Sequence, residues 1–290
     1  MSWRTVVISN TAKLDYQMGF LVVRKGDVTK IHLSEVALLI IETTSVSLTA
    51  ALLSELTKKK IKVIFCDEKR NPSSELVGYY GSHDTSAKIR EQVKWDEDTK
   101  TAVWTEIVSE KIHKQAEHLD YWGCAEANML YGYLDELQFG DSTNREGHAA
   151  KVYFNALFGM DFTRTAENSI NAALNYGYGI ILSAFNREIV SNGYLTQLGL
   201  FHDNMFNQFN LGSDLMEPFR PVVDLKVKKL QPQKFEHEEK MEVLSVLQEE
   251  VQIAGRQEYL SNAIKVYTKS VFDALNDKDA ALVKFYSYEL

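Results

Sequence analysis

Two stretches in the second half of the sequence carry side chains that can bind a divalent cation. Glu146 stands in DSTNREGHAAKVYFNALFG, and His202, Asp214 and Glu217 lie in HDNMFNQFNLGSDLMEPFRPVVD. Carboxylates and an imidazole suit a hard or borderline cation and leave coordination positions for water and phosphate. Such a cation polarises a phosphodiester, lowers the pKa of an attacking hydroxyl or water, and offsets charge on the leaving oxygen. Such a set of side chains could therefore hold a cation beside a phosphodiester.

Glu146 also has an interpretation that needs no ligand. Residues 143–146, TNRE, match the capping box S/T-x-x-E, in which Thr143 caps a helix and Glu146 bonds back to the cap amide. The following EGHAA is less expected, because Gly147 and two alanines remove bulk that a stable helix does not need to lose. Small residues beside an acid suit the close approach of a ligand or of another backbone. The sequence alone leaves both interpretations open.

The second group of candidates can likewise be structural. Asp214 and Glu217 are three residues apart, so a helix would place both carboxylates on one face. Pro218 is tolerated only in a first helical turn, which puts the pair near a helix N-terminus. There Ser213 or Asp214 could cap the helix, and Glu217 could complement its dipole. His202 lies in an apolar stretch, where a hydrogen-bonded core histidine is an ordinary finding.

The elements that must position these residues fall into two parts of different character. Short β-branched segments between turn signals predict a β-rich part that contains one helix, over residues 47–60. From Trp95 onward nearly the whole chain has helical period. The expected strands are residues 4–9, 19–24, 29–34, 36–42 and 61–67, and the expected later helices include residues 144–158, 168–192, 213–229, 238–252 and 260–275.

These elements predict an α+β multidomain protein. A small β-rich N-terminal domain covers residues 1–84, a linker follows over residues 85–95, and a larger all-α catalytic domain covers residues 96–290. The formal charge of −8 argues against a surface that is basic throughout, although a local basic patch suffices to bind nucleic acid. Cys66 and Cys124 show no CxxC spacing, which predicts a reducing, cytoplasmic location. We expect no signal peptide and no membrane helix, because no apolar run approaches ~20 residues.

Long ordered blocks carry a resemblance to a known family. They include WRTVVISN, IHLSEVALLIIETTSVSLTAALLSELTKKKIKVIFCDEKRNP, NREGHAAKVYFNALFG, INAALNYGYGIILSAFNREIV, TQLGLFHDNMFNQFNLGSDLMEPFRPVVD and YLSNAIKVYTKSV. Through these blocks almost the whole chain resembles the CRISPR adaptation integrase/endonuclease, the first and most widespread CRISPR-associated protein family. It is most similar to the subtype II-A branch. The resemblance implies a β-rich N-terminal dimerisation domain and a helical catalytic domain.

The resemblance also implies a site and a reaction. Glu146, His202 and Glu217 fall on the family's catalytic metal ligands, with Mg²⁺ or Mn²⁺ as the cofactor. Asp214 falls on an additional acidic position, and the last ligand is an aspartate in many members where this chain has Glu217. The implied reaction joins a 3′-hydroxyl end of short protospacer DNA to a phosphodiester at the CRISPR repeat. DNA is cut when water takes the place of the hydroxyl.

The implied partners are double-stranded DNA (protospacer and CRISPR repeat), a second copy of the chain, and a second small CRISPR adaptation protein. In this branch a ring-forming DNA-end-binding protein and the RNA-guided nuclease also take part. Because the chain is acidic, its DNA-binding cations must gather on one surface. The candidates are Arg145, Arg164, Arg187, Arg220, Lys226 and Lys228. Two alternatives stay open: a non-catalytic DNA-binding scaffold whose acids are helix caps, and a metal hydrolase acting on another phosphate ester.

Overall fold

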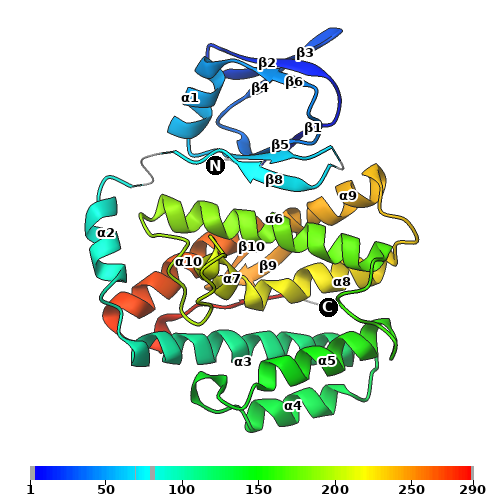
Figure 1. Cartoon of the computed structure of the whole chain (residues 1–290), viewed down its shortest axis with the longest axis vertical. Helices are drawn as coiled ribbons and strands as arrows, with labels where there is room; N and C mark the ends of the chain where they lie inside the picture. Colours follow the sequence, from blue (N-terminus) through cyan, green and yellow to red (C-terminus); the bar gives the residue numbers. More distant parts are fainter. Residues whose placement is uncertain (1–3, 69, 79–81, 289–290) are drawn as a thin grey trace. The chain divides into compact units, whose positions relative to one another are not determined.

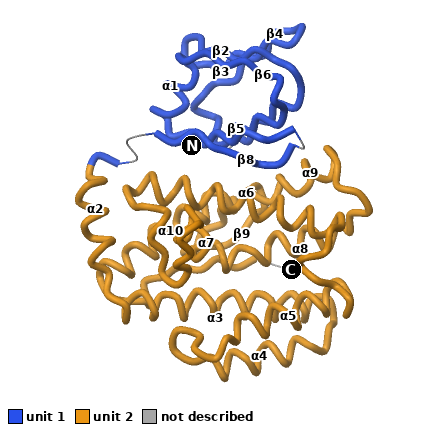
Figure 2. The backbone as a smooth tube through the Cα atoms, in the orientation of Figure 1, with its two compact units in different colours: residues 1–83 blue, residues 84–290 orange. Residues whose placement is uncertain are grey.

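The computed structural model describes residues 4–68, 70–78 and 82–288 of the chain. The chain divides into two compact units, residues 1–83 and residues 84–290 (Figure 2). The first unit is β-rich and the second is mainly helical, so the predicted α+β multidomain class is confirmed. Within the described ranges, no helix is both long and apolar enough to cross a membrane.

The described residues of unit 1 form two four-stranded sheets and one helix (Figure 1). The strands are β1 (Arg4–Ile8), β2 (Ala12–Gln17), β3 (Phe20–Lys25), β4 (Asp27–His32), β5 (Val36–Ile41), β6 (Val46–Leu48), β7 (Lys62–Cys66) and β8 (Pro72–Glu75). One sheet has the order β1-β5-β7-β8 and the other the order β4-β3-β2-β6. Strand β5 is buried at every residue of VALLII, as expected for a strand whose two faces are both covered.

Helix α1 (Ala50–Lys58) closes the core of unit 1. The backbone amide of Leu52 donates to the side chain of Thr49 at 3.3 Å, which caps the helix start. Leu52 and Leu56 are fully buried one turn apart and join the core cluster of both sheets. The helix begins later than the expected residue 47, because residues 46–48 pair with β2 as strand β6.

Unit 2 is built mainly of helices around α3 and α6 (Figure 1). Its α-helices are α2 (Thr85–Gln92), α3 (Glu97–Tyr121), α4 (Ala127–Asp135), α5 (Arg145–Phe158), α6 (Ser169–Ser191), α7 (Asn210–Leu215), α8 (Arg220–Leu230), α9 (His237–Leu244) and α10 (Leu260–Asp277). Its 3₁₀ turns are η1 (Phe139–Asp141), η2 (Glu217–Phe219), η3 (Ser245–Gln248) and η4 (Ala280–Leu282). Helix α3 packs against α4, α5 and α8, and α6 packs against α8, α9 and α10.

A small sheet corrects the prediction that this part is all-α. Strands β9 (Glu250–Ile253), β10 (Arg256–Tyr259) and β11 (Tyr286–Ser287) pair in the order β10-β9-β11. The expected helix over residues 238–252 ends before β9, where Val251 and Ile253 are buried and their neighbours are exposed. This alternation is the period of a half-buried strand, and it overrides the weaker helical pattern.

The segment expected as a linker, residues 85–95, is instead part of unit 2. It forms α2, and the division between the units falls between residues 83 and 84. The side-chain amide of Gln92 donates to the carbonyls of Leu195 and Leu198 at 2.9 and 3.2 Å. The indole of Trp95 donates to Asn276 at 3.0 Å. Two anchoring side chains therefore outweigh the small, polar composition that suggested a linker.

The helix expected over residues 213–229 is broken in the middle. Helix α7 ends at Leu215, the 3₁₀ turn η2 covers Glu217–Phe219, and α8 begins at Arg220. Pro218 lies in the first turn of η2, as its missing amide hydrogen requires. Because of the break, Glu217 precedes α8 instead of lying on its surface, and its side chain is buried in unit 2.

Candidate active site

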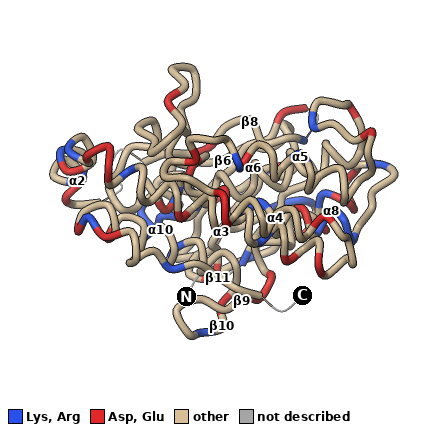
Figure 3. Tube along the Cα trace, turned by 90° about the horizontal axis from the view of Figure 1, so that it is seen from below, with Lys and Arg blue, Asp and Glu red and all other residues tan. Residues whose placement is uncertain are grey.

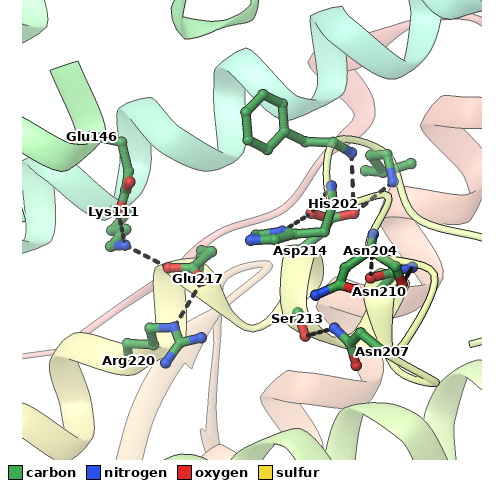
Figure 4. A network of polar contacts seen from close by, with 12 residues as sticks. Lys111, Glu146, His202, Asn204, Asn207, Asn210, Ser213, Asp214, Glu217 and Arg220 are labelled. Atoms are coloured by element: carbon green, nitrogen blue, oxygen red, sulfur yellow. Dashed lines mark hydrogen bonds and ion pairs between the residues drawn. The ribbon is translucent and has the colours of Figure 1, made fainter. Parts of the chain in front are cut away.

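Glu146 and Glu217, which are far apart in the sequence, meet at one lysine. The ammonium of Lys111, on α3, donates to Glu146 Oε1 and, at 2.5 Å, to Glu217 Oε2. Figure 4 shows the two carboxylates converging on this nitrogen from α5 and from η2. The side chains of Lys111 and Glu217 are both 7% exposed, so the pair lies in a region of low dielectric. The fold therefore creates one buried cluster of opposite charges from three distant segments.

The capping box proposed for Thr143 and Glu146 is contradicted by the structure. The N-cap of α5 is Asn144, with φ 54°, and its side chain makes no capping hydrogen bond. The backbone amides of Arg145 and Glu146 donate to the carboxylate of Asp141 at 2.6 and 3.1 Å. Because Asp141 satisfies these amides, the Glu146 carboxylate is free to face Lys111.

Gly147 makes room for a neighbouring side chain. A Cβ atom at this position would lie 2.8 Å from the amide oxygen of Asn144. Asn144 itself occupies the left-handed region of backbone conformation, which brings its side chain back over the first turn of α5. The small residue in EGHAA is thus explained by local packing, without any ligand.

Glu217 is compensated from two sides. The Nε atom of Arg220 donates to Glu217 Oε1 at 2.8 Å, and Lys111 holds the other oxygen. Burial acts to raise the pKa of Glu217, but the charges of Arg220 and Lys111 outweigh it and lower the pKa to about 2. The carboxylate therefore stays ionised, and it is bound to side chains rather than capping a helix.

Asp214 organises the loop that carries His202. Its carboxylate accepts the backbone amides of Leu200 at 2.6 Å, Phe201 at 3.2 Å and His202 at 3.1 Å. The same carboxylate bonds the Nδ1 atom of the His202 ring at 2.5 Å. Asp214 is fully buried, and its two oxygens are occupied by these contacts. It is thus a positioning residue for His202, and the interpretation of Asp214 as a helix cap is contradicted.

His202 is not a core histidine, because 40% of its side chain is exposed. Its ring packs edge-on against Trp104 with centroids 5.9 Å apart, and Phe201 stacks on the same indole at 4.6 Å. The hydrogen bond to Asp214 raises the pKa of His202, and the charge of Glu217 adds to this effect. Figure 4 shows the ring on the side of Asp214 that faces Glu217.

The two carboxylates fit a cation, whereas a complete set of three ligands is not assembled. Among the described residues, no three His, Cys, Asp or Glu side chains are grouped closely enough to hold a metal ion. Glu146 and Glu217 nevertheless converge on a positively charged atom, and the Nε2 atom of His202 has no hydrogen-bond partner within the described residues. Metal ligation by Glu146, His202 and Glu217 stays a prediction.

A cavity of about 240 Å³ opens beside the glutamates. It is lined by Lys111, Gln115, Glu146, Ala150, Phe154, Arg164, Tyr178, Glu217, Arg220 and Asp224. Arg164 donates to Asn175 at 2.7 Å and lies 5.3 Å from the centre of the Tyr178 ring. Arg220 lies over the same ring at 4.7 Å. Two guanidinium groups thus flank the carboxylates, an arrangement that can bind a phosphate beside them.

The other four predicted DNA-binding cations lie outside this cavity. Arg145 pairs with Glu136 at 2.8 Å, and Arg187 lies 3.8 Å from Glu188. Lys226 pairs with two glutamates, and Lys228 donates to the carbonyl of Leu157. Figure 3 shows basic and acidic residues interspersed along the helices of unit 2. DNA binding by these four residues stays a prediction.

Sequence reasoning missed Lys111 and Asp224, which join Tyr178 in this cluster. Lys111 occupies a buried position in the apolar stripe of α3, next to Ile112, and a charge at such a position was a detectable signal. The phenol of Tyr178 donates to Asp224, and both residues are buried. Burial raises the pKa of Asp224 to about 7. No spacing pattern links these three positions, because they lie on three different helices.

Comparison with known proteins adds to this geometry. The family model described as "CRISPR associated protein Cas1" matches residues 5–261. A relative from Neisseria meningitidis serogroup C (strain 8013), named CRISPR-associated endonuclease Cas1, is 38% identical over 229 residues. The aligned residues cover 78% of this chain and 75% of that protein.

Solved structures resemble the chain at low sequence identity. A casposase bound to integration product is 17% identical, with a TM-score of 0.77, over 96% of this chain and 92% of that chain. A chain of the Cas6-RT-Cas1–Cas2 complex is 16% identical, with a TM-score of 0.76, over 99% of this chain. The present chain spans only 36% of that longer chain. At these identities the likeness shows the fold alone.

Proposed function

Because the chain belongs to the Cas1 family of CRISPR-associated proteins, we propose that it is a DNA integrase and endonuclease of CRISPR adaptation, of the subtype II-A branch. It joins the 3′-hydroxyl ends of short protospacer DNA to the CRISPR repeat, and it depends on a divalent metal. The observation that carries the proposal is the convergence of Glu146 and Glu217 on one cationic atom, beside a histidine oriented by Asp214.

Glu146, Glu217 and the Nε2 atom of His202 would hold Mg²⁺ or Mn²⁺. When bound, such an ion supplies Lewis-acid polarisation of the phosphate and of the attacking hydroxyl. Asp214 fixes the ring of His202 through Nδ1, which leaves Nε2 as the nitrogen available to a ligand. A carboxylate that orients a ligating histidine in this way also raises the basicity of the ring.

The reaction exchanges one phosphodiester bond for another. The 3′ oxygen of the protospacer forms a bond to the phosphorus at the repeat boundary, and the bond from that phosphorus to the neighbouring 3′ oxygen breaks. The proton released by the attacking hydroxyl is balanced by the proton that the leaving oxygen takes up. Arg164 and Arg220 line the cavity beside the carboxylates and would neutralise the phosphate charge during the exchange.

Partners of this function are proposed as well. They are double-stranded DNA, a second copy of the chain bound through the N-terminal unit, and a second small adaptation protein. One structural neighbour is a Cas6-RT-Cas1–Cas2 complex, which supports a small Cas partner for this fold. A ring-forming DNA-end-binding protein and the RNA-guided nuclease complete the set in the cytoplasm.

The test is the joining of a short protospacer duplex to a plasmid that carries a CRISPR repeat, in the complete assembly with Mg²⁺ or Mn²⁺. We expect Glu146→Gln, His202→Ala and Glu217→Gln each to reduce joining at least about a hundredfold, since each removes a proposed metal ligand. Glu110→Gln is the matched control, because this glutamate precedes Lys111 on α3 but pairs with Lys114, at 3.1 Å, and not with Lys111.

Joining at the wild-type rate by Glu146→Gln and His202→Ala would contradict the proposed site. Equal loss in the Glu110→Gln control would point to general damage of the fold. The scaffold alternative predicts DNA binding without joining in the wild-type protein. The hydrolase alternative predicts turnover of a small phosphate ester in the absence of DNA, with the same three residues required.

A further inference from the structure

Lys111 lies where a cation shared by Glu146 and Glu217 would have to be. Its ammonium bonds one oxygen of each glutamate, while Arg220 holds the remaining bonded oxygen of Glu217. We propose that Lys111 competes with the divalent metal for the glutamate pair, and that it moves to Gln115 and Asp224 when the metal binds. This inference rests on the metal-dependent function proposed above and adds a positioning residue to it.

Simultaneous binding is disfavoured by electrostatics. An ammonium and a divalent cation between the same two carboxylates would repel strongly, because the cluster is buried and poorly screened. Arg220 remains on Glu217 in either arrangement, since its nitrogen uses Oε1 rather than the Lys111 oxygen Oε2. The ammonium must therefore leave before the metal can bind both glutamates.

A second location for the ammonium is present in the same cavity. Within the part of the chain that the structure describes, Gln115 Oε1 and Asp224 Oδ2 are buried oxygens without a hydrogen-bond partner, and both residues line the cavity together with Lys111. Gln115 is four residues after Lys111 on α3, so it lies one turn away on the same face. Burial raises the pKa of Asp224, and the charge of Lys111 opposes this rise, so the two groups interact electrostatically.

Unpaired buried acceptors cost free energy until a donor reaches them. An ammonium carries three N–H donors on a flexible four-carbon chain, so one movement can reach both oxygens, and its charge favours the ionised carboxylate of Asp224 that accepts it. The cavity of about 240 Å³ leaves space for that movement. Metal binding would then exchange one set of hydrogen bonds of Lys111 for another, instead of leaving a buried charge unpaired.

The chain contains a matched control for Lys111. Lys114 lies three residues later on α3, and its side chain is 3% exposed. It also bonds two glutamates, Glu110 at 3.1 Å and Glu117 at 3.2 Å. Neither of these acids lines the cavity. A variant of Lys114 therefore removes an equally buried ammonium with two partners, without changing the proposed metal site.

The experiment measures Mn²⁺ binding to the purified full chain by calorimetry, together with the melting temperature with and without Mn²⁺. If Lys111 occupies the glutamate pair in about nine molecules out of ten, Lys111→Met raises Mn²⁺ affinity about tenfold. The same variant melts at a lower temperature without Mn²⁺ and gains more from Mn²⁺ than the wild type does. Lys114→Met lowers the melting temperature but leaves Mn²⁺ affinity unchanged.

Gln115→Leu tests the second location of the ammonium and should lower Mn²⁺ affinity, whereas Lys111→Met should raise it. This test remains valid even if Lys111→Met does not fold. It removes an acceptor of the displaced ammonium, so Mn²⁺ affinity falls several-fold while the melting temperature without Mn²⁺ does not fall. Unchanged or weaker Mn²⁺ binding by Lys111→Met would overturn the competition. Unchanged Mn²⁺ binding by Gln115→Leu would overturn the second location of the ammonium. Glu146→Gln separates the two proposals: Mn²⁺ binding that survives this change overturns the metal site itself.

Discussion

At the scale of single residues, the candidate active site is a balance of buried charges. Glu146 and Glu217 are negative, Lys111 and Arg220 are positive, and three ion pairs join them. Removing one member leaves its partner ionised and without a counter-charge in the interior, which is costly. The members of this cluster should therefore respond sharply to pH and to charge-neutralising substitutions.

Glu217 should make unfolding depend on pH in the acidic range. Its folded pKa of about 2 lies below the ordinary value of 4.5, so its stabilising contribution is complete above pH 4.5 and is lost as pH falls towards 2. The difference corresponds to a free energy on the order of 3 kcal/mol. Glu217→Gln should flatten this dependence when urea unfolding is measured from pH 2 to 7 without divalent cations. An unchanged slope would show that Glu217 is not the titrating group.

Asp224 should act in the opposite direction. Burial raises its folded pKa from 3.8 to about 7, so the folded protein keeps a proton that the unfolded chain releases. Stability therefore falls as pH rises from about 4 to 7, by an amount on the order of 4 kcal/mol. Asp224→Asn should remove this fall in urea unfolding experiments at pH 4 and pH 8. Asp273→Asn, at an exposed position on α10, is the control, and an equal effect there would contradict the prediction.

At the scale of elements, short interruptions of the helices decide where the functional side chains point. The break at Glu217–Phe219 separates α7 from α8 and directs Glu217 to Lys111. The loop before α7 is held by Asn210, whose side-chain amide donates to Gln197 and Asn204 carbonyls at 3.1 Å each. Figure 4 shows Asn204, Asn207 and Ser213 bonded around the same turn. The loop of His202 is thus fixed by side chains and needs no regular secondary structure.

Two glycines of α6 provide a test of how closely the helices pack. A Cβ atom at Gly177 would clash with Val223 of α8, whereas a Cβ atom at Gly179 would meet nothing within 4 Å. Gly177→Ala should therefore destabilise the protein by about 1–3 kcal/mol through overpacking. Gly179→Ala should stabilise it by roughly 1 kcal/mol, because alanine favours a helix. Urea unfolding measures both, and a shift of the same sign in the two variants would refute the packing argument.

At the scale of the whole molecule, every residue of the candidate active site belongs to unit 2. Lys111, Glu146, His202, Asp214 and Glu217 all lie within residues 84–290. Unit 1 has its own buried core and contributes none of these side chains. This division separates the proposed catalytic role of unit 2 from the proposed dimerisation through unit 1.

Two fragments test this division and the boundary between the units. A fragment of residues 84–290 should fold, bind Mn²⁺ as the full chain does, and be monomeric by analytical ultracentrifugation. In a fragment of residues 96–290 the free energy of unfolding should be about 3–5 kcal/mol lower, because the fragment lacks Trp95. The ring centroid of Trp95 lies 5.3 Å from that of Tyr194. A dimeric 84–290 fragment would place the dimer contact in unit 2. Equal stability of the two fragments would support the prediction that residues 85–95 are a linker.

The sequence by itself determined the family, the fold class and the proposed ligands Glu146, His202 and Glu217. Ordered blocks and local periodicity carry that information, because each depends on residues close together along the chain. The tertiary structure alone decided that Asp141 caps α5, that residues 85–95 pack into unit 2, and that Lys111 bridges the glutamates. These features depend on burial and on contacts between distant segments, and neither is encoded in the spacing of neighbouring residues.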